Sequence, residues 1–496
     1  MWQSTDTRSH EFDDVRRLID RLNRIDDSGD RALRDLFDPR IELSVARAPG
    51  RLDVMGGIAD YSGSLVLEMP IAEAACVAAQ RGDDGWVRVV AFGDEDGDAD
   101  RGAAARARGG GAFEPGGKVF EAPIEALMPG GEPPPLEQAR AYFAAGGAGA
   151  DQHWAAYVAG TAVVLAHELG WRCGGGLRLL LHSDVPAGKG VSSSAAIEVA
   201  AMTALAGAFG LKVGARETAL WCQRVENEVV GAPCGVMDQM TSARGRANTL
   251  LRLLCQPAEL LGHTLLPDGV ALWGIDSGIR HAVSGSDYGS VRVGAFMGRR
   301  IIFDLAGEEQ YGGYLANVTP EEFDDRFAEA IPESMRGGEF LERYGETGDP
   351  VTRVDPDAEY AVRQPTRHPI DEHARVRRFA DLLEQGACGG AAMAELGGLM
   401  VGSHQSYSSC GLGSDGTDDL VRRVLDVGPS GGLYGAKITG GGSGGAVAVL
   451  GRPDAEPAVR RIADAYAADT GRDARLFAGS SPGARAFGCL TLAPVR

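Results

Sequence analysis

Long apolar runs, paired cysteines and a positive charge balance are all missing from this sequence. No charge-free apolar run reaches the ~18 residues that a membrane-spanning helix needs. The N-terminal segment is polar and lacks the apolar stretch of a secretory signal. The net charge of −20 disfavours nucleic acid as a partner, because phosphate binding requires clustered Lys and Arg. We therefore expect a cytoplasmic protein that binds neither membranes nor nucleic acid.

The eight cysteines are scattered along the chain. None forms a Cys-x-x-Cys pair, and none has His partners at the spacing of a zinc site. We interpret them as reduced thiols. They are Cys76, Cys173, Cys222, Cys234, Cys255, Cys388, Cys410 and Cys489.

The length of 496 residues exceeds what one hydrophobic core serves, so two domains are expected. We assign residues 1–262 to the first and 263–496 to the second, which opens on a strand pattern at residues 272–276. Residues 83–134 are rich in Gly, Ala and Asp and are expected to form a surface loop. Residues 308–367 are polar and show short helical patterns without an interpretable motif.

Hydrophobic spacing predicts the elements on which the motifs lie. The strand near residues 41–45 runs into a turn at residues 48–50, so the first motif is expected at a strand end. A Gly- and Pro-containing loop at residues 231–239 follows a helix. The other predicted elements are helices near residues 11–26, 154–169, 192–209, 216–230 and 454–470, and strands near residues 177–181 and 446–450.

Three Gly-containing stretches follow one another at residues 48–63, 185–196 and 437–445. Each alone is weak evidence, because the chain contains 71 Gly and such runs arise by composition. Three different patterns in a fixed order are a much more specific signal. They match the three motifs of the GHMP small-molecule kinases.

The second stretch places small residues ahead of a Ser-rich helix start, so that backbone amides and the positive helix end can converge on one anion. This pattern predicts a phosphate cradle. It is not a Walker loop, because Lys189 is followed by Gly190 instead of Ser or Thr. A simple serine helix cap is the alternative interpretation.

Phosphoryl transfer from a nucleotide needs a divalent cation on oxygen ligands and a group that orients or deprotonates the acceptor. Glu226 and Asp238 are the best candidate carboxylates. Glu226 lies among apolar neighbours, where a carboxylate is costly unless it faces a site or a partner. Asp238 follows the loop at residues 231–239, a position from which a side chain can reach a substrate. Either residue could instead be an ordinary solvated or salt-bridged acid.

Five stretches extend the match and resemble galactokinase-type GHMP kinases. Across nearly the whole chain the sequence is more specifically similar to the kinase portion of plant L-arabinokinases, and this includes residues 332–356. The stretches are residues 51–63, 231–242, 277–298, 433–445 and 479–484.

The resemblance implies an α+β fold with two domains. The N-terminal domain would be like ribosomal protein S5 domain 2, the C-terminal domain would be ferredoxin-like, and the active site would lie between them. Plant L-arabinokinases carry an additional N-terminal half that resembles a glycosyltransferase. This sequence contains no such half, so a stand-alone kinase is expected.

The resemblance also implies roles for individual residues. Asp238 corresponds to the base that accepts the proton of the sugar C1 hydroxyl, and Arg51 to the arginine beside it. Ser194 and Glu226 match magnesium ligands, with ATP as the nucleotide. Positions expected at the sugar are Gly57, Ile58, Asp60, Gly235 and Tyr288; those expected at the nucleotide are Pro186, Gly188, Lys189, Gly190, Ser192, Ser193, Ser194 and Ala195; the third-motif loop contributes Gly440, Gly441 and Gly442.

The sequence departs from galactokinases at Gly57 and Ile58, where they carry a Glu-His pair that bonds the C6 hydroxyl of galactose. A hexose placed there would lose hydrogen-bond partners, whereas L-arabinose is galactose without the C6 group and loses nothing. We therefore expect an L-arabinose 1-kinase that uses ATP and Mg²⁺ and yields β-L-arabinose 1-phosphate. A uronic acid would need Arg or Lys near this position, which Gly-Ile does not supply.

Several alternatives stay open. Gly57 could merely relax a turn, so that another loop reaches the C6 region. The chain could be a galactokinase or a galacturonate or glucuronate 1-kinase. It could also be a non-catalytic sugar and nucleotide sensor, although Ser193, Ser194, Ala195 and Asp238 are all retained. The sequence does not decide between monomer and homodimer or between ATP and GTP.

Overall fold

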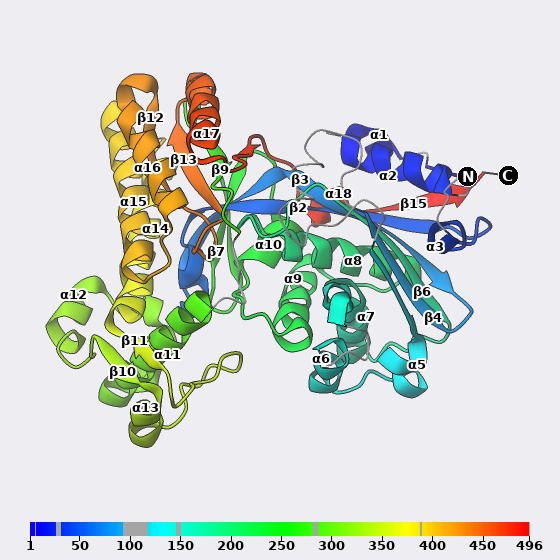
Figure 1. Ribbon diagram of the computed structural model, residues 1–496, viewed down its shortest axis with the longest axis horizontal. Coiled ribbons are helices and arrows are strands. Elements are labelled where there is room, and N and C mark those ends of the chain that lie inside the picture. Colours follow the sequence, from blue (N-terminus) through cyan, green and yellow to red (C-terminus); the bar gives the residue numbers. More distant parts are fainter. Residues whose placement is uncertain are drawn as a thin grey trace.

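The computed structural model describes residues 1–4, 6–25, 31–92, 118–144, 150–280, 286–386 and 389–495. Figure 1 shows a large first lobe, coloured blue to green, joined to a second lobe of orange and red elements. A smaller group of yellow-green helices lies below the second lobe. The N- and C-terminal ends lie side by side at the far edge of the first lobe.

The first lobe is built on a nine-stranded sheet, most of it antiparallel. Its long central strands are β2 (Leu43–Met55) and β3 (Leu65–Gly82), which pair with each other. Next to β2 the sheet continues with β15 (Cys489–Pro494) and then β1 (Trp2–Gln3). Next to β3 it continues with β6 (Gly176–Ser183), β4 (Trp86–Phe92) and β5 (Lys118–Pro123). The first residues of β3 pair instead with β7 (Thr249–Leu254), which pairs with β8 (Glu259–Leu265).

Both faces of this sheet are covered, as the alternation of side chains along β2 requires. Leu43 and Val45 point into one core, and Ala46 and Ala48 into the other. The smaller core is completed by α2 (Asp13–Asn23), with α1 (Arg8–Glu11) and α3 (Arg31–Arg34) beside it. The larger core is covered by α5 (Ile124–Leu127), α6 (Leu136–Ala144), α7 (Ala156–Leu169), α8 (Ser193–Phe209), α9 (Ala215–Arg224), α10 (Met237–Arg244) and α18 (Ala484–Phe487).

The second lobe contains a four-stranded antiparallel sheet in the order β12 (Leu433–Ile438), β13 (Ala446–Gly451), β9 (Ala271–Asp276) and β14 (Leu476–Phe477). Helices α16 (Asp415–Val427) and α17 (Glu456–Thr470) bury their apolar sides against one face. Ser414 and Thr417 form a capping box that fixes the start of α16. Helix α15 (Gly390–Ser409) packs on the other face, toward the first lobe.

Residues 286–384 form the third group of elements. Helices α11 (Ser286–Ala306) and α14 (Arg363–Glu384) pack against each other. The polar segment between them nevertheless has a core of its own, with Phe323, Phe327 and Phe340 buried. Its elements are α12 (Pro320–Glu322), α13 (Gly337–Tyr344), β10 (Ser334–Arg336) and β11 (Glu359–Ala361).

Two local predictions are wrong. The first motif does not begin where a strand ends, because β2 continues through Pro49 and Gly50 to Met55, with register shifts where it pairs with β3. The segment at residues 83–134 is not simply a loop, since β4 and β5 pair with each other on either side of residues 93–117. Those intervening residues, and Cys388, lie outside the described part of the chain.

The other predicted elements are found close to where they were expected, including α2, α7, α8, β6 and β13. Within the described ranges, no helix combines the length and the apolar character that crossing a membrane would require. The boundary between residues 262 and 263 stays a proposal. The final strand β15 pairs with β2, so the end of the chain returns to the first sheet.

Candidate active site

A cavity of about 590 Å³ collects residues from all three motifs, a size that suits a small-molecule site. Most of the predicted site residues line it. Gly57, Pro186, Ala195 and Gly442 do not appear in its lining. The predicted residues that do are Arg51, Ile58, Asp60, Gly188, Lys189, Gly190, Ser192, Ser193, Ser194, Glu226, Gly235, Asp238, Tyr288, Gly440 and Gly441.

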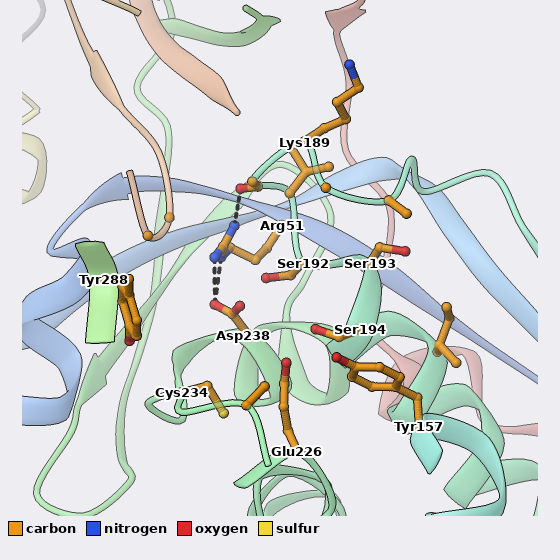
Figure 2. Close-up of a pocket in the computed structure, with 18 of the residues that line it drawn as sticks. Arg51, Tyr157, Lys189, Ser192, Ser193, Ser194, Glu226, Cys234, Asp238 and Tyr288 are labelled. Carbon is orange, nitrogen blue, oxygen red and sulfur yellow. Dashed lines mark hydrogen bonds and ion pairs between the residues drawn. The ribbon is translucent and has the colours of Figure 1, made fainter. Parts of the chain in front are cut away.

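Arg51 and Asp238 form an ion pair at the centre of the cavity (Figure 2). The Arg51 Nη2 and Nε atoms lie 2.8 and 2.9 Å from Asp238 Oδ1. Arg51 Nη1 also donates to the carbonyl oxygen of Gly190, at 2.7 Å. Asp238 keeps 21% of its side-chain surface exposed, so one face of this carboxylate stays open to the cavity. A substrate hydroxyl can therefore approach a carboxylate whose orientation is already fixed.

The buried Glu68 lies behind Arg51, with Oε2 3.3 Å from Nε. Burial opposes the charge of Arg51, but the carboxylates of Asp238, Glu68 and Asp53 outweigh it and raise the pKa of Arg51. Burial, and after it the charge of Asp53, raises the pKa of Glu68 well above its ordinary value. The guanidinium charge is thus kept beside the cavity, where it can offset negative charge on a transferred phosphoryl group.

The phosphate loop ends where the 17-residue helix α8 begins, at Ser193. Gly188, Gly190 and Ser192 all have positive φ angles, a backbone conformation that glycine adopts readily and that is found in anion-binding loops. The buried Ser192 hydroxyl has no hydrogen-bond partner in the described structure. Such a loop at the positive end of a helix suits an anionic ligand.

The loop also rests directly on β2. The Arg51 amide donates to the carbonyl oxygen of Val191, at 3.1 Å. A Cβ atom added to Gly50 would lie 2.6 Å from that same oxygen, so only glycine allows this approach. The first motif, on β2, therefore packs directly against the phosphate loop of the second motif.

Lys189 lies differently from the serines of the same loop. Its Nζ is 2.6 Å from Asp276 Oδ2, at the end of β9 in the second lobe. In Figure 2 the side chain points away from Asp238 and Glu226. Its predicted contact with nucleotide is untested, and in this structure the lysine joins the phosphate loop to the second sheet.

Ser194, Glu226 and Asp238 face a common space (Figure 2). Glu226 lies on the π-helical turn Val225–Val230 that extends α9, and its Oε2 accepts a hydrogen bond of 2.7 Å from Gln239. Burial, together with the charge of Asp238, raises the pKa of Glu226 to about 7. The described residues contain no group of three or more His, Cys, Asp or Glu that could hold a metal by themselves.

Asp60, Gly235 and Tyr288 also line the cavity, and Asp60 lies directly against Gly235. A Cβ atom at Gly235 would lie 1.7 Å from Asp60 Oδ2, so the loop at residues 231–239 can pass the carboxylate only at a glycine. Burial and the charge of Asp238 raise the pKa of Asp60 to about 7. A ligand hydroxyl that meets this group can donate to its charged form or accept from its neutral form.

The pKa of Asp60 predicts a measurable loss of stability with rising pH. The folded protein holds the Asp60 proton up to a pKa of about 7, whereas the unfolded chain releases it near 3.8. This contribution is therefore complete below pH 4 and lost as the pH rises toward 7. We expect the free energy of unfolding of Asp60→Asn, measured in urea between pH 5 and 8, to fall less steeply than that of the wild type. Equal slopes for Asp60→Asn and the exposed control Asp325→Asn would contradict this assignment.

Ile58 is 2% exposed and packs with Tyr288 and Tyr407. It reaches the cavity from the 3-10 helix Gly57–Ser62, where the galactokinase-type motif has its Glu-His pair. Gly57 has a φ of +47°, and its amide donates to Asp53 Oδ1 at 3.0 Å. The wall at this end of the cavity is thus aliphatic and aromatic.

A buried ion pair connects the first motif to the third. Lys437 Nζ lies 2.6 Å from Asp53 Oδ2, and neither side chain has any exposed surface. The Asp53 amide donates to Thr439 Oγ1 at 2.8 Å. The Gly440–Gly441 backbone is therefore held at the cavity by contacts that start in the first lobe.

Sequence reasoning missed several residues of the site. Trp154 and Tyr157 line the cavity near the phosphate loop, but they precede or begin α7 and carry no motif. Arg292 forms a two-contact ion pair with Asp349, at 2.8 and 2.9 Å, and donates to the Cys234 carbonyl oxygen at 3.3 Å. Asp349 lies in the polar segment that showed no motif, so only its buried partner reveals its role.

Two family models match parts of the chain. Residues 156–246 match the model of the GHMP kinases N-terminal domain, and residues 33–81 match the galactokinase galactose-binding signature. The chain is 30% identical to the galactokinase of Chloroflexus aggregans, over 86% of this chain and 89% of that protein. This chain belongs to the galactokinase family of GHMP kinases.

This GHMP kinase is also similar to a protein that is named for a different sugar. The L-arabinokinase of Arabidopsis thaliana is 47% identical over 92% of this chain, and the chain spans 47% of that protein's length. The crystal structure of Lactococcus lactis galactokinase complexed with galactose superposes with a TM-score of 0.68 at 19% identity, covering 94% of this chain and 98% of that one. The predicted family and the α+β GHMP kinase fold are confirmed, and the family uses ATP.

Proposed function

We propose that this GHMP kinase transfers the γ-phosphoryl group of ATP to the anomeric hydroxyl of L-arabinose, giving β-L-arabinose 1-phosphate. The observation that carries the phosphoryl-transfer part is the Arg51–Asp238 pair at the meeting point of the three motifs. Asp238 would orient the sugar C1 hydroxyl and accept its proton as the new O–P bond forms. Arg51 would offset the charge of the transferred group.

The cavity residues near the phosphate loop fit a nucleotide with its metal ion. The phosphate loop and the N-terminus of α8 would receive the phosphates, and the aromatic residues Trp154 and Tyr157 offer the cavity's apolar surface to the base. The Ser194 hydroxyl and the Glu226 carboxylate are the hard oxygen donors that suit Mg²⁺, which commonly takes one or two protein ligands and substrate phosphates. Bound there, Mg²⁺ would neutralise charge on the phosphate oxygens.

The choice of L-arabinose rests on the wall at Ile58. A hydroxymethyl group there would meet the aliphatic side chain of Ile58 in place of a Glu-His pair, and a hydroxyl left unsatisfied costs roughly 1 to 3 kcal/mol. The 47% identity to a protein named L-arabinokinase supports the same sugar. L-Arabinose has no C6 group, so Ile58 can occupy the volume that this group would need.

A uronic acid is the competing acceptor, and its carboxylate would need a free cation. Arg292 is the guanidinium whose charge reaches Asp60 and Tyr288, but it is 4% exposed and engaged by both oxygens of Asp349. It is therefore poorly placed to bind a second carboxylate. Arg280 and Lys118 also line the cavity, which makes the two uronic acids necessary members of the test panel.

The test is a comparison of kcat/KM for L-arabinose, galactose, galacturonate and glucuronate with ATP and Mg²⁺. We expect L-arabinose to exceed galactose by about 5- to 150-fold, the factor that corresponds to one unsatisfied hydroxyl. A preference for galactose or a uronic acid would reject the assigned sugar. Absence of phosphorylation with all four, together with ATP binding, would favour a sensor.

A further inference from the structure

Tyr407 lies against Gly57, one of the two positions where this sequence departs from the galactokinase-type motif. It comes from α15, and its side chain has no exposed surface. A Cβ atom added to Gly57 would lie 1.5 Å from the Tyr407 hydroxyl oxygen and 2.7 Å from Cζ. The phenol thus fills the volume that any side chain at position 57 would enter. Tyrosine at 407 therefore requires glycine at 57.

The Tyr407 hydroxyl also joins two walls of the cavity. It accepts a hydrogen bond from the Ile58 amide at 2.8 Å and donates one to the Gly440 carbonyl oxygen at 2.8 Å. Ile58 and Gly440 both line the cavity, although Tyr407 itself does not. This buried hydroxyl therefore links the first and third motifs at Ile58 and Gly440, beside the contacts that Asp53 makes to the third motif.

Surrounding groups hold the Tyr407 ring in place. His368 packs edge-on against it, with the ring centroids 5.1 Å apart, and Lys437 Nζ lies 5.4 Å from its centroid. Lys437 is in turn paired with Asp53, which accepts the Gly57 amide. With the ring fixed from these sides, the hydroxyl has little freedom to move when a ligand enters.

We propose that Tyr407 is a positioning residue that sets the sugar preference, because it excludes a side chain at position 57 and holds Ile58 against the acceptor ring. The inference rests on the proposed function, since it places the sugar beside Ile58. It extends that function to a residue that does not line the cavity and belongs to none of the three motifs.

The activity test is the ratio of kcat/KM for galactose to that for L-arabinose. Tyr407→Phe keeps the ring but removes both hydrogen bonds, so we expect the ratio to rise about 2- to 10-fold through a changed sugar KM. The matched control is Tyr360→Phe, which removes another buried phenol hydroxyl. That hydroxyl accepts a hydrogen bond from the Asp355 amide and lies in the core of the third group of elements. The control should leave the ratio unchanged. Equal ratios in the two variants would overturn the proposal.

The volume relation is tested by thermal unfolding, which does not depend on the sugar. Gly57→Ala should lower Tm strongly because its Cβ meets the Tyr407 hydroxyl. The double variant Gly57→Ala/Tyr407→Leu should lower Tm by less than the sum of the two single changes. Additive losses would show that the two residues do not share one volume, and would overturn the proposal.

The kcat/KM ratio and the Tm measurement together distinguish a failure of this proposal from a failure of the proposed function. If the wild type prefers galactose or a uronic acid, the assigned acceptor fails. The non-additive Tm, and a shift of preference in Tyr407→Phe among the sugars that are used, would still support Tyr407 as the positioning residue.

Discussion

Asp238→Asn is expected to lower kcat about 10²- to 10⁴-fold, the range of a positioned general base. The asparagine keeps the size of the side chain and can still accept a hydrogen bond from Arg51, but it cannot take up the C1 proton. Sugar and nucleotide binding should persist, because Asp238 is one of many groups lining the cavity. Steady-state kinetics with L-arabinose, together with calorimetric binding of ATP, measures both quantities.

The control for this variant is Asp325→Asn, which removes an exposed carboxylate outside the cavity. It should leave kcat within the error of the assay. Turnover of Asp238→Asn close to that of the wild type would exclude general-base catalysis by this residue. Positioning and the charge of Arg51 would then have to account for the rate.

Lys437→Met is expected to destabilise the protein by about 3 to 5 kcal/mol, the range for breaking a buried ion pair from one side. Lys437 and Asp53 have no exposed surface, so the remaining Asp53 carboxylate would lose its counter-ion in a dry environment. The Asp53 carboxylate would keep the hydrogen bonds that it accepts from the amides of Gly57 and Gly440. Urea unfolding at neutral pH measures the free energy of unfolding.

Two further variants test this second prediction. Arg460→Met breaks an exposed ion pair with Glu456 and should change stability by only about 0 to 1 kcal/mol. The double change Asp53→Asn/Lys437→Met should recover part of the loss, because no unpaired charge stays buried. A loss for Lys437→Met no greater than that for Arg460→Met would contradict the importance of the pair.

Much of the fold could be predicted from local sequence patterns. The regular spacing in α2, α7, α8 and β6 marks elements whose buried faces follow the helix or strand period. The continuation of β2 through Pro49 and Gly50 could not be predicted, because turn residues inside a strand are tolerated here by register shifts in its pairing with β3. The third group of elements was missed because the apolar residues of the polar segment are widely spaced and form a core only together with residues of α11 and α14.

The site, like the fold, was predicted where residues belong to local motifs and missed where they act through distant contacts. Arg51, Asp238 and the phosphate-loop residues come from motifs, and the structure places them around one cavity. Glu68 and Tyr407 act through contacts between residues distant in sequence, and nothing in their immediate neighbours indicates a role. Lys189 shows that a motif position does not fix the direction of a side chain. Its position predicts a contact with nucleotide, whereas in the structure its side chain pairs with Asp276.

The support that β2 gives the phosphate loop bears on the thermodynamics of ligand capture. Because Gly50 and the Arg51 amide contact the Val191 carbonyl oxygen, the segment that we propose to bind the phosphates is held on β2 without any ligand. Little chain entropy then remains to be lost on association, so a larger share of the contact energy is expressed as affinity. We therefore expect the pre-organisation of the proposed phosphate loop to depend on the strand on which it lies.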